Sequence, residues 1–331
     1  MIKSPTHPEK RKRSPKLIPS KPKKNIRIGQ REIAVLKSLA EYRFLTADQI
    51  RRLHFPKGSQ SYCNERLRGL FHKPCCFVDR HPLPHEWGRG SPKLAYSLTK
   101  RGYKRLNEAG IGAWATDQSV YKLKTSTPLY KKHEIAVNEF RIACELAVEK
   151  NGWEIEEWVT EVEFKSPSLL KEMKVFDPEW GRNLPVAPDG FFSLYFPKED
   201  KTTLFFLELD RGTMESARFR RKKIRGYHLF AEKWQEIKRF RKYKDLSIAF
   251  RVLTVVDGGL QRAWNLKTKC AEKEFESEER ERKLAKSWIY YFTTLDEITP
   301  ETVFTKPIWL IPYRSRTEKE RFELIDFERG F

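Results

Sequence analysis

The strongest limit on the fold of this chain comes from two short apolar segments, residues 191–196 and 204–207, separated by a polar turn. Apolar runs of this length around a turn predict the two strands of an antiparallel hairpin. Asp189 stands just before the first run and Glu208 just after the second. Antiparallel pairing would therefore bring both carboxylates to the same end of the sheet. Two converging carboxylates suit a hard divalent cation, which can stabilise charge on an attacked phosphodiester. The alternative is a surface Asp in a turn and a Glu paired with Arg211.

Length and charge narrow the class of protein. The 331 residues are enough for about two domains, each with its own core. A formal net charge of +21 favours an anionic polymer as partner, because binding neutralises phosphates and releases counterions. No apolar run has the length of a membrane span and no signal peptide is apparent, so we expect no membrane partner. Five cysteines without C-x-x-C spacing favour a reducing, cytoplasmic location.

The first segment, residues 1–28, is predicted to be a disordered basic arm. Its first 27 residues hold ten Lys or Arg and five Pro, with almost nothing apolar to bury. Such an arm suits non-specific contact with phosphates. The alternative is a tail that only keeps the protein in solution.

Residues 29–112 are predicted to form a winged helix-turn-helix. Thr46 is the expected N-cap of the second helix, and Cys63 and Leu67 have the spacing of core positions on the third. The opposite face of that third helix carries side-chain types that read base edges in the major groove. A strand over 76–79, a loop and a strand over 94–98 complete the wing. The predicted DNA contacts of this domain are Gln60, Asn64, Arg66, Arg68, Arg89 and Lys93. A protein-docking module of the same fold is the alternative.

Possible zinc ligands gather in the wing: His72, Cys75, Cys76, His81 and His85. Imidazole and thiolate are zinc ligands, but this spacing matches none of the usual patterns. We therefore do not expect zinc and interpret these side chains as buried residues of the wing.

Residues 113–130 are predicted to be a linker, followed by a second domain over 131–314 and a charged, weakly structured tail over 315–331. An amphipathic helix is expected from His133. The further predicted elements are strands over 153–164, 191–196, 204–207, 248–256 and 288–294, an insertion over 165–187, and helices over 217–237 and 272–286.

This order of helix, three strands, helix and strand resembles the PD-(D/E)xK nuclease superfamily. Pro188-Asp189 matches its first motif, and Glu208-Leu209-Asp210 occupies its second. More closely, the winged helix, the helix led by His133, Pro188-Asp189-Gly190 and the run Glu208 to Gly212 resemble the replication-relaxation family of mobile-element proteins. This resemblance covers about residues 30–260. It implies an α+β fold, with an N-terminal winged helix-turn-helix and a restriction-endonuclease-like domain.

The resemblance also implies a site. Its metal ligands would be Asp189, Glu208 and Asp210, with Mg²⁺ or Mn²⁺ as the cofactor. Asp210 stands where the superfamily usually has lysine, so the nearest replacement is Lys223, with Lys222 as the second choice. His133 would orient the phosphate or act as a base, unless it is only structural. The predicted DNA contacts of this domain are Arg211, Arg218, Arg221 and Lys222.

Together these features predict a DNA-binding protein of a plasmid or mobile element, with a role in replication or relaxation, that nicks or cleaves DNA. One rival is an inactive nuclease fold that binds DNA and assembles partners as a replication initiator or regulator. A second rival is a docking module for another replication protein. The expected partners are double-stranded DNA, other replication or mobile-element proteins and a second copy of the chain.

Overall fold

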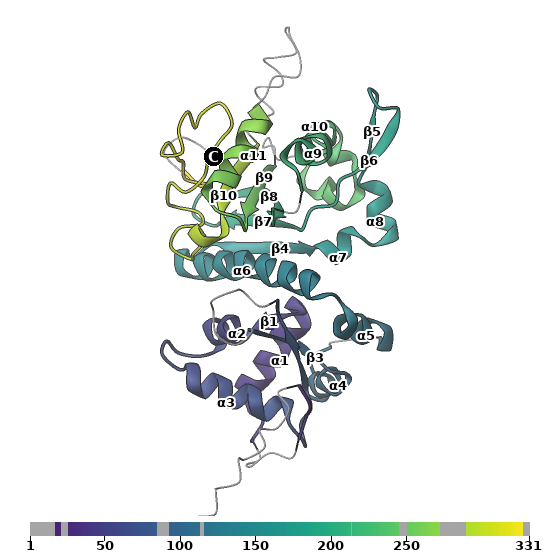
Figure 1. The fold of residues 1–331 in the computed structure, drawn as a ribbon, viewed down its shortest axis with the longest axis vertical. Helices are drawn as coiled ribbons and strands as arrows, with labels where there is room; N and C mark the ends of the chain where they lie inside the picture. The colour runs from purple at the N-terminus through teal and green to yellow at the C-terminus, as the bar shows by residue number, and fades with distance from the viewer. Residues whose placement is uncertain are drawn as a thin grey trace, which may run out of the picture. The chain divides into compact units, whose positions relative to one another are not determined.

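The computed structural model describes residues 17–20, 26–84, 93–112, 116–212, 214–244, 250–271 and 289–326 (Figure 1). It divides into two compact units, residues 1–135 and 136–331. Three predictions lie wholly or largely outside the described residues. These are the basic arm, the charged helix over 272–286, and the wing residues His85 and Arg89. None of the described helices is both long enough and apolar enough to cross a membrane.

The first unit combines helices with a small antiparallel sheet. Its helices are α1 (Gln30–Tyr42), α2 (Ala47–His54), α3 (Gln60–Phe71), α4 (Lys100–Glu108) and α5 (Asp117–Thr125). Its strands are β1 (Leu45–Thr46), β2 (Val78–Pro82) and β3 (Leu94–Leu98), in the order β1-β3-β2. Thr46 caps α2 as predicted, since its hydroxyl accepts a hydrogen bond from the Gln49 N–H. Strand β2 begins later than predicted because Cys76 has a φ of 49°, a left-handed conformation that no strand accommodates.

The predicted linker is partly helical. Helix α5 lies within it, and its N-cap Thr116 accepts a hydrogen bond from the Ser119 N–H. Helix α6 (Pro128–Asn151) begins five residues before His133. Pro128 suits the first turn of a helix because its missing N–H has no partner there, and Thr127 caps the Tyr130 N–H. The last residues of the predicted linker, 128–130, therefore belong to helix α6.

The second unit is built on one mixed sheet. Its strands are β4 (Glu154–Thr160), β7 (Gly190–Phe196), β8 (Lys201–Asp210), β9 (Arg251–Val256) and β10 (Tyr290–Thr294), in the order β10-β9-β8-β7-β4. Strands β4, β7 and β8 pair antiparallel, which confirms the predicted hairpin, and β8, β9 and β10 pair parallel. A separate hairpin, β5 (Lys174–Asp177) and β6 (Arg182–Pro185), occupies the predicted insertion.

Helices cover both faces of this sheet (Figure 1). On one face α6 packs through Phe140 against Phe192 and Phe205. The other face packs Phe206 against Tyr227 and neighbouring aromatics. The elements covering this second face are α9 (Ser216–Phe219), the π-helical turn η1 (Arg220–Ile224), α10 (Arg225–Phe230) and α11 (Leu260–Ala271). The short remaining elements are α7 (Glu161–Phe164), α8 (Pro167–Glu172), η2 (Trp234–Glu236), η3 (Lys238–Tyr243) and η4 (Leu295–Glu297).

Three sequence predictions for this unit were wrong. The strand over 153–164 ends at Thr160, which caps α7 in a capping box with Glu163. The helix over 217–237 stops at Phe230, and the following turns let Trp234 and Phe240 join the same core. The tail is ordered where the structure describes it, because Phe322 forms a β-bridge with Trp309 and pairs its backbone N–H with the Trp309 carbonyl.

Candidate functional site

Three carboxylates stand side by side at one edge of the large sheet. Strand register places them there, because Thr160 on β4 opposes Gly190 on β7, which opposes Leu207 on β8. The next residues at this edge are Glu161, Asp189 and Glu208. We call these three residues the acidic row. Residues directly opposite in an antiparallel pair lie on the same face, and in this row that face is the one covered by α9 and α10.

The Asp189 side chain is fixed by the neighbouring strand. Its Oδ2 atom accepts a hydrogen bond of 2.7 Å from the Leu209 N–H, while its own N–H donates to the Leu207 carbonyl at 2.9 Å. Asp189 is 9% exposed. A carboxylate held so firmly at the sheet edge loses little conformational entropy when it binds a ligand.

Glu208 is buried and held by two groups from the covering helices. Lys223 Nζ lies 2.7 Å from Glu208 Oε2, and the Tyr227 hydroxyl donates to Glu208 Oε1 at 2.8 Å. Lys223 also donates to the Ala187 carbonyl at 3.1 Å. The Lys223 ammonium is thus held between a buried carboxylate and a backbone carbonyl.

Burial sets the protonation of this pair. It raises the pKa of Glu208 to about 7, aided by the Asp189 charge and opposed by Lys223 and Tyr227. Burial alone would lower the pKa of the Lys223 ammonium, but the Glu208 and Asp189 carboxylates together raise it. Burial therefore favours the protonated form of Glu208, and the Lys223 ammonium favours its ionised form.

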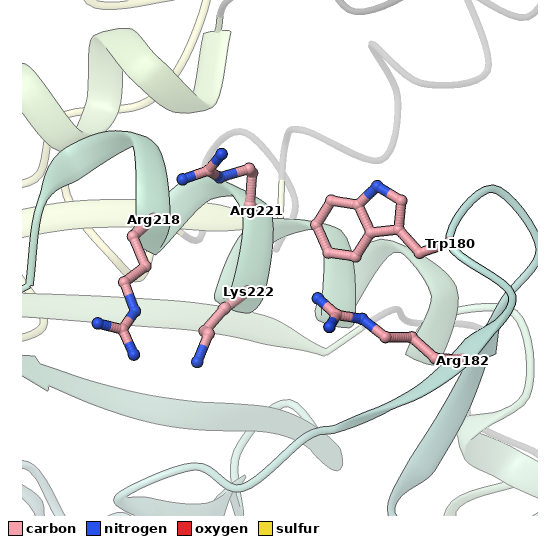
Figure 2. Close-up of a pocket in the computed structure, with 5 residues that line it drawn as sticks. All are labelled: Trp180, Arg182, Arg218, Arg221 and Lys222. Carbon is pink, nitrogen blue, oxygen red and sulfur yellow. The ribbon is translucent and has the colours of Figure 1, made fainter.

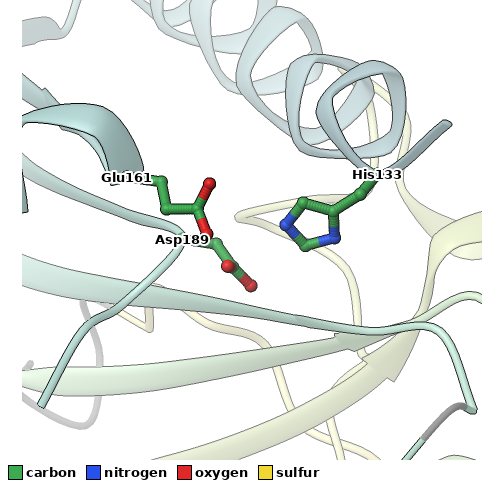
Figure 3. A group of neighbouring side chains, drawn as sticks. All are labelled: His133, Glu161 and Asp189. Atoms are coloured by element: carbon green, nitrogen blue, oxygen red, sulfur yellow. The ribbon is translucent and has the colours of Figure 1, made fainter. Parts of the chain in front are cut away.

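Two members of the acidic row, Glu161 and Asp189, come together with His133 in a group that could hold a metal ion, and Glu208 is not a member of this group. One ligand atom from each of His133, Glu161 and Asp189 lies within 4.8 Å of the others (Figure 3). His133 stands on α6, which continues unbroken into the second unit. Glu161 also pairs with Lys165, which follows the short helix α7 as its C-cap residue. Sequence reasoning missed Glu161, although Thr160 and Glu163 carry the T-x-x-E signal of a capping box that starts a helix at this residue.

Asp210 is engaged in a different contact. Its carboxylate receives two hydrogen bonds from Arg262, at 2.8 Å from Nε and 3.2 Å from Nη2, and one from the Gly212 N–H at 3.2 Å. Gly212 has a φ of 70°, which favours glycine in this turn. Arg211 Nε lies 3.6 Å from Asp257. Asp210 therefore ties the end of β8 to α11, whereas we had predicted a third metal ligand.

A basic hollow of about 640 Å³ opens beside helix α9 and the turn η1 (Figure 2). Its lining residues are Trp180, Arg182, Arg218, Arg221 and Lys222. Three of them were predicted DNA contacts. Trp180 and Arg182 come from the β5–β6 hairpin and were not predicted, because the insertion gave no strand periodicity that would place them near α9.

Helix α3 of the first unit presents a polar face to solvent. Gln60, Asn64 and Arg68 are exposed, and the opposite positions are buried, as the helical spacing predicted. Arg66 has another role, because its Nε lies 2.8 Å from Glu32 and Nη2 donates to the Arg27 carbonyl. Arg66 thereby fastens α3 to the start of α1. Lys93 is exposed before β3.

Comparison with known families now identifies the chain. The family described as replication-relaxation matches residues 36–243. The chain belongs to the replication-relaxation family. No curated protein and no solved structure matches it.

The match to the replication-relaxation family covers both α3 and the acidic row, together with Lys223. Family membership suggests a role in the replication or relaxation of plasmid or mobile-element DNA. Within this replication-relaxation protein, the described histidines of the wing have partners other than a metal. His81 bonds the Ser97 hydroxyl at 2.8 Å, and burial lowers its pKa to about 4. His72 Nδ1 accepts from the Ser20 N–H at 3.1 Å.

Proposed function

We propose that this replication-relaxation protein binds DNA through its first unit and nicks or cleaves it through its second, with Mg²⁺ or Mn²⁺ as cofactor. The observation that carries the proposal is the acidic row with Lys223 at its edge. A basic protein rarely buries acidic side chains together unless they bind a cation or pair with bases.

The residues of the row fit a hard divalent ion. Glu161 and Asp189 would supply carboxylate oxygens, which such ions prefer, and His133 lies within 4.8 Å of both. Glu208 would join them from the adjacent strand by giving up its contact with Lys223 or Tyr227. Burial raises the pKa of Glu208, with a smaller contribution from the Asp189 charge, and a bound cation would favour the ionised form of both carboxylates. When bound, the ion would polarise a phosphodiester and lower the pKa of a water molecule.

The side chains around the row would then neutralise charge on the phosphate, fix the position of Glu208 and bind the strand backbone. The Lys223 ammonium lies beside Glu208, so it is placed to neutralise charge that develops on a phosphate bound at the row. Tyr227 holds Glu208 in one rotamer through its hydroxyl. In the basic hollow, Arg218, Arg221 and Lys222 offer contacts for the strand backbone.

The order of elements in the second unit supports a PD-(D/E)xK-type domain. Helix α6, the antiparallel strands β4, β7 and β8, the α9–α10 segment and the parallel strand β9 follow the succession that the sequence analysis associated with this superfamily. The superfamily lysine is replaced by Asp210, which contacts Arg262, and Lys223 supplies the positive charge from the following helix.

The first unit has the element order and pairing expected of a winged helix. Helices α2 and α3 are joined by a short turn, and β2 and β3 form the antiparallel pair that follows them. The exposed face of α3 carries Gln60, Asn64 and Arg68, whose side chains match the donor and acceptor patterns of adenine and guanine.

The test is conversion of supercoiled plasmid to nicked or linear DNA, with Mg²⁺, with Mn²⁺ and with chelator. We expect metal-dependent conversion by the wild type and its loss in Asp189→Asn and Glu208→Gln, with duplex affinity nearly unchanged. The matched control is Glu199→Gln, an exposed acid in the turn of the same hairpin, which should retain full activity. Plasmid left intact by the wild type in both metals would overturn cleavage and favour the inactive DNA-binding platform.

A further inference from the structure

The basic hollow contains an aromatic side chain whose position is unusually well fixed. Trp180 sits in the turn between β5 and β6. The buried Asp177 accepts hydrogen bonds from the backbone N–H groups of Glu179 at 3.0 Å and Trp180 at 3.3 Å. This turn therefore holds the tryptophan backbone in one conformation.

A second contact fastens the same turn to the covering helix. Arg225 of α10 pairs with Asp177 through two hydrogen bonds and lies 2.6 Å from Glu179. Its guanidinium carbon is 5.0 Å from the centre of the Trp180 ring. Asp177 is fully buried, so this pairing is protected from water. Trp180 is thus positioned before any ligand arrives.

Arg182 covers the ring from the other strand of the hairpin. Its guanidinium carbon also lies 5.0 Å from the ring centre (Figure 2). Unlike Arg225, Arg182 is exposed and forms no ion pair within the described part of the chain. Arg182 can therefore move off the Trp180 ring at little cost in free energy. A ligand can then take its place on the ring, with Arg182 stacked on the ligand.

Across the hollow stand the cations of α9 and η1, namely Arg218, Arg221 and Lys222. A planar ring facing several cations is the chemistry of a nucleotide site, since bases stack on aromatic rings and phosphates bind arginine and lysine. A volume of about 640 Å³ has room for a nucleotide. In an intact duplex both faces of each base are already stacked, so only an unpaired base can use the tryptophan.

We propose that the basic hollow binds an unpaired nucleotide of a DNA strand, with its base stacked on Trp180 and its phosphates held by the facing cations. The second unit would then prefer DNA with a single-stranded segment over intact duplex. This inference rests on the proposed DNA-binding role but not on cleavage.

The experiment measures the affinity of the full chain for oligothymidylate and for a blunt duplex of the same length, at one fixed salt concentration. Trp180→Ala should weaken binding of the single strand by about 10- to 100-fold, the usual loss when one stacking residue is removed. Trp180→Phe should recover most of that loss, because phenylalanine keeps an aromatic face. Affinity for the duplex should change less than about threefold in both variants.

The matched control is Phe176→Ala. Phe176 is a 58% exposed aromatic on the same hairpin and is not among the residues lining the hollow. We expect wild-type affinity for both DNAs in this variant. Single-strand affinity unchanged in Trp180→Ala would overturn the inference, and so would an equal loss on single strand and duplex. An equal loss in Phe176→Ala would also contradict it.

Failure of this inference is distinguishable from failure of the proposed function. A wild type that binds duplex and nicks plasmid, alongside a Trp180→Ala variant with wild-type single-strand affinity, removes only the nucleotide site. A wild type that binds neither DNA removes the DNA-binding role, and the inference falls with it.

Discussion

Helix α3 and the acidic row differ in how their polar side chains are presented. On α3, Gln60, Asn64 and Arg68 are exposed and extend into solvent from a helix whose opposite face is buried. In the acidic row, Glu208 is only 3% exposed and contacts Lys223 and Tyr227. The first arrangement suits contact with a surface as large as a DNA groove. The second suits a small ion and a single phosphate, because burial strengthens electrostatic interactions.

This contrast indicates which kind of site tolerates change. Gln60, Asn64 and Arg68 are exposed on α3, so their loss should affect DNA recognition and leave the fold intact. Asp189 and Glu208 are held by a neighbouring strand and by the covering helices, so the loss of either should change the protonation and geometry of the other. Variants on α3 should therefore change the recognition of DNA, whereas variants at the acidic row should change the rate of cleavage by a larger factor.

The largest effect is expected from Lys223→Met. This change removes the ammonium next to Glu208 while keeping a side chain of similar length. If Lys223 stabilises charge on the phosphate, single-turnover cleavage at saturating DNA should slow by about 10²–10³-fold. The control is Lys222→Met, which removes the neighbouring exposed lysine and should change DNA affinity more than rate. Equal rate losses in both variants would mean that Lys223 acts only as one more phosphate contact.

Two arginines of α3 show the same contrast within one helix, because Arg66 is held by an ion pair and Arg68 is exposed. Arg66→Ala breaks the contact with the buried Glu32 and should lower the free energy of unfolding of the first unit by about 1.5–3 kcal/mol. Arg68→Ala should change that stability by less than about 0.5 kcal/mol. It should instead weaken a preferred DNA site by about 1–3 kcal/mol and affect random sequence less. Denaturant unfolding and competition binding measure the two quantities.

The pH dependence of cleavage tests the buried carboxylate. Because burial raises the pKa of Glu208 to about 7, a proton competes with the metal below that pH and is absent above it. Cleavage at subsaturating Mg²⁺ should therefore fall about tenfold per pH unit below pH 7 and level off above it. A rate that stays constant from pH 8 down to pH 5 would show that Glu208 is already ionised, or that it does not bind the metal.

The smallest effect concerns the basic arm. Deleting residues 1–16 removes six cationic side chains and keeps the contacts of Ser20 and Arg27 with the first unit. If the arm binds phosphates, the slope of log K against log salt for duplex binding should decrease by about 0.9 for each phosphate that the arm neutralises. An unchanged slope would assign the affinity to the folded units alone.

Local sequence patterns predicted the parts of this structure that depend on local periodicity. The buried face of α3 follows from helical spacing at Cys63 and Leu67, and the β7–β8 hairpin follows from two apolar runs around a turn. The place of Asp189 and Glu208 at one sheet edge follows from that same hairpin, since antiparallel register fixes which residues lie opposite.

The sequence did not reveal the parts that depend on how distant segments meet. Glu161 joins the acidic row only because β4 pairs with β7, and alternating residues concealed the helix start at Thr160. Trp180 reaches the basic hollow only because Asp177 and Arg225 fasten the inserted hairpin to α10. No periodic pattern records such a contact, because it joins two segments about fifty residues apart.

Binding of a divalent metal by the acidic row underlies the proposed function, and titration of the protein with Mn²⁺ by isothermal calorimetry measures it without DNA. At pH 8 we expect saturable binding to the wild type, a loss of at least about tenfold in affinity for Asp189→Ala, and unchanged affinity for Glu199→Gln. A wild type that binds no Mn²⁺, or an Asp189→Ala variant that binds it as tightly as the wild type, would contradict metal binding at this row.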